Sequence, residues 1–147
     1  MGRNLAAAAL CALAIGTAAA AGHHRLEPIL PGTLDWFSPP GNPALEAAWV
    51  VGAEGDASLY ALRVRLRPGA KIPPHTHPDA RYSTVLVGTL HVGFGTVEDP
   101  AAMVAVPAGG VYVAPAGQPH YLWARDGEVV YQEAGFGPTA TTPAGAR

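Results

Sequence analysis

Three histidines stand in two short stretches that are rich in glycine and proline. The first stretch is GAKIPPHTH at residues 69–77, and the second is GGVYVAPAGQPH at residues 109–120. Alternate side chains of an extended segment point to the same face, so His75 and His77 can offer two imidazoles to one ion. His120 follows a Pro-x-Gly turn that fixes where a strand begins, which brings a remote third imidazole to a preset position. We therefore predict a metal site formed by His75, His77 and His120.

The N-terminus predicts an export signal over residues 1–21. Arg3 supplies a positive flank, residues 5–20 form an apolar run rich in alanine, and residues 19–21 are the small residues that a signal peptidase accepts. The run is too short for a comfortable membrane span. We therefore expect a periplasmic or secreted protein that has no contact with the membrane after cleavage.

Composition excludes several classes of function. The single cysteine, Cys11, lies inside the predicted signal, so the mature chain has no disulfide, thiolate ligand or cysteine nucleophile. Nine basic residues face eleven acidic ones, and the basic residues form no run. We therefore expect no nucleic-acid partner.

The rest of the chain predicts an all-β domain. Its 18 glycines and 15 prolines separate short apolar runs, and no long helical period is present outside the signal. We expect an N-terminal arm over residues 22–44, anchored by Trp36 and Phe37, then one barrel over residues 45–138 and a disordered tail over residues 139–147. The predicted strands are 46–51, 58–66, 82–94, 103–106, 110–114, 120–124 and 129–133.

The two histidine stretches also match a pair of known motifs, G-x5-H-x-H-x3/4-E-x6-G and G-x5-P-x-G-x2-H-x3-N. The matching residues are Gly69, His75, His77, Gly88, Gly109, Pro115, Gly117 and His120. Through these residues the chain resembles the cupin superfamily. Two polar positions differ, because the glutamate position holds Arg81 or Tyr82, depending on the gap, and the asparagine position holds Ala124.

The resemblance implies a small, single-domain cupin-like β-barrel, also called a double-stranded β-helix or jelly roll. It implies one divalent metal ion, and Fe, Mn, Ni and Zn are not distinguished. Some thiol and diketone dioxygenases of the superfamily hold iron with three histidines and no carboxylate. Cupins often pair through sheet edges, so we also expect a homodimer.

Arg81 fits the glutamate position best, with a gap of three residues after His77 and of six before Gly88. Its parity with His75 and His77 then places it toward the site. A guanidinium cannot ligate a metal, and near a cation it is costly unless an anion lies between them. We therefore expect Arg81 to bind an anionic substrate, with Tyr82 as a second candidate. The alternative is that Arg81 turns outward or pairs with Asp79.

The strand after the turn signal Asp126-Gly127 offers two candidates for a fourth ligand. A two-residue hairpin turn would place Glu133 opposite His120, whereas a bulged three-residue loop would place Gln132 there. Glu133 would add a carboxylate to the site, and Gln132 would orient a ligand or water. The alternative for Glu133 is a solvated charge at a strand end.

These observations predict an exported metal-binding protein that acts on a small, anionic molecule. Oxygenation is the first reaction to consider, because three imidazoles leave up to three positions open on an octahedral iron. With Zn, Ni or Mn the same site would suit isomerase or lyase chemistry. The rival hypothesis is a non-catalytic protein that captures a metal ion or small ligand outside the cytoplasm.

Overall fold

The computed structural model describes residues 27–145 of the chain, which form β-strands and one short 3-10 helix. In chain order these elements are η1 (Pro31–Thr33), β1 (Leu45–Val51), β2 (Leu59–Leu66), β3 (Lys71–Thr76), β4 (Arg81–Val87), β5 (Thr89–Phe94), β6 (Val104–Pro107), β7 (Val111–Ala114), β8 (His120–Trp123), β9 (Val129–Phe136) and β10 (Thr142–Pro143).

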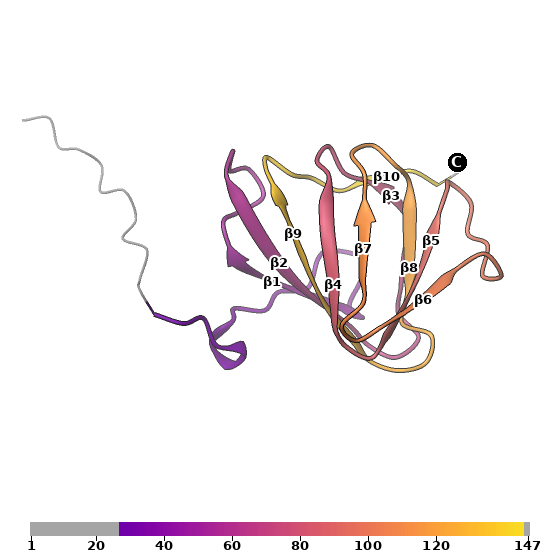
Figure 1. Ribbon diagram of the computed structural model, residues 1–147, viewed down its shortest axis with the longest axis horizontal. Helices are drawn as coiled ribbons and strands as arrows, with labels where there is room; N and C mark the ends of the chain where they lie inside the picture. The colour runs from indigo at the N-terminus through magenta and orange to yellow at the C-terminus, as the bar shows by residue number, and fades with distance from the viewer. Residues whose placement is uncertain (1–26, 146–147) are drawn as a thin grey trace, which may run out of the picture.

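The strands form two five-stranded antiparallel sheets. One has the order β1-β2-β9-β4-β7 and the other the order β10-β3-β8-β5-β6. In Figure 1 the first sheet occupies the left and centre of the view, and the second lies to the right. The predicted all-β barrel of the jelly-roll type is confirmed.

Period-two alternation explains which face of each strand is buried. In β9 the side chains of Val129, Tyr131 and Glu133 are buried, whereas those of the intervening residues are more exposed. The buried side chains of both sheets form one apolar core, with Leu66, Val85, Leu90, Leu122 and Tyr131 at most 1% exposed. Burial of each such side chain contributes roughly 1.5–3 kcal/mol. The core therefore fixes the second sheet, which carries His75 and His120, against the first.

One predicted strand is in fact two. Residues 82–94 were expected to be continuous, but the chain changes sheets at Gly88, between β4 and β5. Gly88 has a φ of +76°, and a Cβ there would lie 2.2 Å from the carbonyl oxygen of Glu128. Only glycine adopts this conformation at such a close approach without strain.

The segment that carries the first two histidines forms a strand that was not among those predicted. β3 contains Pro73 and Pro74, which disfavour a regular ladder, and its pairing with β8 is irregular between Ile72 and His75. The pairing still places His75 directly opposite His120. Tertiary pairing thus overrides the local effect of the prolines.

The described part of the tail, residues 139–145, is not disordered as expected. Thr142 and Pro143 pair with β3, opposite Thr76 and His75, to form β10. The backbone N–H of Ala144 also donates to the carbonyl oxygen of Pro74. The prolines of β3 leave an edge that this short segment covers, and composition alone does not reveal that pairing.

The predicted hairpin between β8 and β9 is wrong. β8 pairs with β3 and β5, whereas β9 pairs with β2 and β4 in the other sheet. The Asp126-Gly127 turn therefore connects the two sheets, and neither Glu133 nor Gln132 lies opposite His120. Glu133 instead pairs with Leu62 on one side and Ser83 on the other.

The N-terminal arm contacts the barrel from Trp36 onward. Phe37 forms a backbone bridge with Ala47, and the Trp36 ring lies under the Arg65 guanidinium at 4.2 Å. Residues 27–35 are mostly exposed and extend away from the barrel in Figure 1. The predicted signal lies outside the described residues. Within residues 27–145 no helix is long and apolar enough to cross a membrane.

Candidate metal centre

The three histidines converge inside the barrel. One ring nitrogen of each lies within 4.8 Å of the corresponding nitrogens of the others. His75 lies on β3, His77 follows that strand, and His120 begins β8. The three residues are at most 5% exposed. The N–H of Gly117 donates to the carbonyl oxygen of His77 at 2.8 Å, so the turn before His120 is tied directly to the first histidine stretch.

Backbone carbonyl groups orient all three imidazole rings. Nδ1 lies 2.7 Å from the Pro73 oxygen in His75, 2.8 Å from the Ala140 oxygen in His77, and 3.2 Å from the Gln118 oxygen in His120. A carbonyl oxygen accepts only from a protonated Nδ1, which leaves each Nε2 as the free electron-pair donor.

The free nitrogens fit a divalent ion. Nε2 of His77 and of His120 is buried without a hydrogen-bond partner among residues 27–145. Burial lowers the pKa of His75 to about 4 and that of His77 to about 3, and it also lowers the pKa of His120. Neutral imidazole is the form that binds metal. Three neutral, oriented imidazoles suit Fe, Mn, Ni or Zn.

Arg81 points inward, and carboxylates of the protein neutralise its charge. Its side chain is 2% exposed, and its guanidinium donates to Glu133 at 2.8 Å and to Asp79 at 2.9 Å. It also bonds the hydroxyl of Thr139. Arg81 therefore shares the inward face of the histidines, as its position along the strand predicted, and it also pairs with Asp79, as the alternative predicted. The anion that we expected from a substrate is supplied by two side chains.

Asp79 also accepts hydrogen bonds from two hydroxyl groups of the same cluster. The Thr139 hydroxyl donates to Oδ1 of Asp79 at 2.6 Å, and the Tyr60 hydroxyl donates to Oδ2 at 2.5 Å. Burial disfavours the charged form of Arg81, but Glu133, Tyr60 and Asp79 outweigh it and raise the pKa of Arg81. Arg81 is therefore a fixed cation inside a hydrogen-bonded cluster, although its Nε has no partner among residues 27–145.

Two sequence candidates lie on the outer face of their sheet. Tyr82 is 62% exposed, because neighbours on a strand point to opposite faces and Arg81 points inward. Gln132 accepts a hydrogen bond from Arg63 at 2.6 Å on the same outer face. Neither Tyr82 nor Gln132 lines the cavity beside the histidines, and the roles predicted for them stay predictions.

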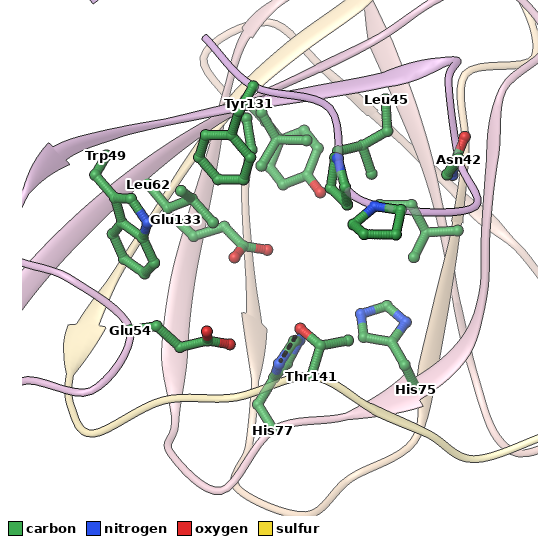
Figure 2. Close-up of a pocket in the computed structure, with 16 residues that line it drawn as sticks. Asn42, Leu45, Trp49, Glu54, Leu62, His75, His77, Tyr131, Glu133 and Thr141 are labelled. Carbon is green, nitrogen blue, oxygen red and sulfur yellow. Dashed lines mark hydrogen bonds between the residues drawn. The ribbon is translucent and has the colours of Figure 1, made fainter. Parts of the chain in front are cut away.

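Glu133 lies at the wall of a cavity beside the histidines. The cavity has a volume of about 480 Å³ and is also bordered by His75 and His77. Figure 2 shows the carboxylates of Glu133 and Glu54 pointing into the same open space as these two rings. Burial raises the pKa of Glu133, and Arg81 opposes that rise. Glu133 is thus not a solvated strand-end charge, and it is not among the residues whose ligand atoms cluster with the histidines.

Sequence reasoning missed other residues of the cavity, among them Glu54, Trp49 and Thr141. The alternation of β1 gives a signal for Trp49, because it shares an inner face with Leu45 and Ala47. Glu54 lies in a loop and Thr141 in the tail that was expected to be disordered, so no local pattern marks them.

Comparison with known families gives a match to the family described as "Cupin domain" over residues 62–131. Germin-like protein 1-1 of Oryza sativa subsp. japonica is 39% identical over 83 residues, which are 56% of this chain and 34% of that protein. Germin-like protein subfamily T member 2 of Arabidopsis thaliana is 36% identical over 61 residues, which are 41% and 28% of the two chains. The chain thus spans about a third of the length of these relatives.

Solved structures share the fold at low sequence identity. The polyketide cyclase RemF from Streptomyces resistomycificus superposes with a TM-score of 0.68 at 14% identity, over 83% of this chain and 87% of that one. An RmlC-like cupin from Shewanella frigidimarina gives a TM-score of 0.59 at 18% identity, over 79% and 89%. The paired histidine motifs, the two-sheet barrel and these matches agree, and the chain belongs to the cupin superfamily.

Proposed function

We propose that this protein is a mononuclear metal enzyme that acts on a small molecule bound in the cavity beside His75 and His77. The observation that carries the proposal is the convergence of three buried imidazoles whose Nδ1 atoms are fixed by carbonyl groups. Buried polar nitrogens are costly without a partner, so a bound ion accounts for the free Nε2 atoms. The cavity supplies the space for a ligand within reach of that ion.

His75, His77 and His120 would hold the ion, which would supply a Lewis acid that polarises an oxygen of the substrate. Glu133 is the group available for proton transfer, because its carboxylate points into the cavity. Arg81 fixes that carboxylate through Oε2. The apolar walls keep water away from the bound molecule.

The identity of the ion would decide the reaction class. Iron held by three histidines, with three further positions open, favours oxygenation of the substrate. Zinc, nickel or manganese favours isomerase or lyase chemistry in which a proton moves and no electron is lost. Because the Glu133 carboxylate points into the cavity and can accept a proton there, we favour isomerase or lyase chemistry. Oxygenation is the alternative.

The first experiment is elemental analysis of protein purified after export. We expect about one divalent ion per chain in the wild type and strong loss in the His75→Ala, His77→Ala double variant. The matched control is His91→Ala, since His91 is a buried histidine outside the cluster. Equal metal content in the wild type and the double variant would exclude this site.

A second experiment separates an enzyme from a protein that only captures a metal or ligand. Glu133→Gln keeps the shape of the side chain and removes its basicity. Under the enzyme proposal this variant keeps its metal and loses turnover of any substrate found by screening. If the loaded wild type turns over none of a broad panel of small molecules, non-catalytic capture is the better reading. Export and homodimer formation are further proposals, supported by the N-terminal pattern and by the family.

A further inference from the structure

The cavity beside the histidines has mostly apolar walls. They are formed chiefly by the inner faces of β1 and β2, by one residue of β3, and by the end of the N-terminal arm. The main apolar contributors are Phe37, Pro39, Leu45, Trp49, Leu62 and Ile72. Such walls favour a ligand with an apolar body, because its burial removes apolar surface from water on both sides.

No lysine or arginine is among the described residues that line the cavity, whereas two carboxylates are. Glu133 and Glu54 both point into the open space. Arg81 donates to Glu133, Asp79 and Thr139 and does not itself line the cavity. An anion entering the cavity would therefore meet the carboxylates of buried Glu133 and exposed Glu54 before any guanidinium.

Glu133 is the most constrained of the cavity carboxylates. It is 4% exposed, and Arg81 holds its Oε2 at 2.8 Å. Figure 2 shows its carboxylate directed into the cavity, so Oε1 can accept a hydrogen bond from a ligand. An acceptor in a fixed position selects ligands that carry an O–H or N–H group there.

We propose that the cavity takes an uncharged, largely apolar small molecule, and that Glu133 excludes anions from it and accepts a hydrogen bond from the ligand's polar group. This inference rests on the proposed function in placing the ligand beside the three histidines. It replaces the anionic substrate expected from the sequence, because the basis of that expectation was an unpaired Arg81.

The test compares two probes of the same shape and different charge, para-fluorobenzamide and para-fluorobenzoate. Binding to the mature protein is measured by fluorine NMR titration at neutral pH. The protein is used in its metal-free form and in its zinc-loaded form. We expect the metal-free protein to bind the amide at least about tenfold more tightly than the benzoate. In the zinc-loaded protein the amide should still bind at least as tightly as the benzoate.

The variant Glu133→Gln should raise the affinity for the benzoate by about fivefold or more and leave that for the amide within about threefold. The matched control is Glu98→Gln, because Glu98 is an acidic residue that pairs with Lys71 outside the cavity. Thermal unfolding of each variant shows whether it is folded. The comparison in the wild type needs no variant, so the proposal stays testable if Glu133→Gln does not fold.

Three results would overturn the inference: benzoate binding as tightly as the amide in the metal-free protein, tighter benzoate binding in the zinc-loaded protein, or no binding of either probe. A wild-type protein that holds no metal but prefers the amide would sink the proposed metal site and leave this inference standing. A protein that holds about one ion per chain but prefers the benzoate would support the metal site and overturn this inference.

Discussion

A single side chain, that of Arg81, joins several buried polar groups beside the cavity. A buried guanidinium is tolerated because Glu133 and Asp79 lie within 2.9 Å of it and Thr139 completes the cluster. The cluster fixes the carboxylate that faces the cavity, so one residue affects both stability and the site.

Removal of Arg81 should be costly. Arg81→Met leaves two buried carboxylates without their cation, and we expect a loss of about 3–5 kcal/mol in the free energy of unfolding, measured in urea. The matched control is Arg65→Met, whose ion pair with Glu46 is about one-third exposed; we expect it to cost less than about 1 kcal/mol. Equal losses in the two variants would contradict the role assigned to the buried cluster.

The histidines make the stability of the metal-free protein depend on pH. Burial lowers the pKa of His75 to about 4 and that of His77 to about 3, below their ordinary value of 6.5. The unfolded chain therefore binds more protons as the pH falls below 6.5, and stability falls with it until the folded-state pKa values are reached.

At pH 5 each of these two histidines should cost about 2 kcal/mol relative to pH 7. The measurement is urea unfolding of protein stripped with a chelator, in wild type and in the His75→Ala, His77→Ala variant. The wild type should lose about 4 kcal/mol more than the variant over this range. The same loss in both proteins would show that these histidines titrate normally.

At the level of elements, the site depends on β10 and the segment before it. Ala140 accepts from His77, Thr139 bonds both Arg81 and Asp79, and Thr142 and Pro143 cover the edge of β3. A segment without a sequence motif therefore orients one histidine and completes the ion cluster.

Deletion of residues 139–147 should lower the free energy of unfolding by several kcal/mol, because it removes the carbonyl oxygen bonded to His77 and the Thr139 hydroxyl bonded to Arg81 and Asp79. It should also weaken zinc binding, since the ring of His77 loses the carbonyl group that orients it. The control is deletion of residues 146–147, which removes none of these contacts. Calorimetry and zinc titration of both proteins measure the effect, and a long deletion without effect would contradict the role assigned to this segment.

At the level of the whole molecule, two jelly-roll sheets enclose the site and leave its entrance at the cavity bordered by the arm and the tail. We expect the mature protein, secreted from a bacterial host, to begin near Gly22, because residues 19–21 are the small residues before the cleavage point. Intact mass spectrometry of the exported protein checks this. A mass that includes residues 1–21 would show that the signal is not removed.

The sequence by itself determined the fold class and the three histidines, because these depend on local rules. Alternation along a strand set the shared face of His75 and His77, and glycine at positions such as 88 marks positive φ angles. Tertiary structure alone decided the neighbours of those residues. Arg81 meets Glu133 across 52 positions of the chain, and His77 meets Ala140 across 63. Such pairings follow from which strands share a sheet, and the local pattern around Asp126-Gly127 predicted that pairing wrongly because the chain crosses there from one sheet to the other.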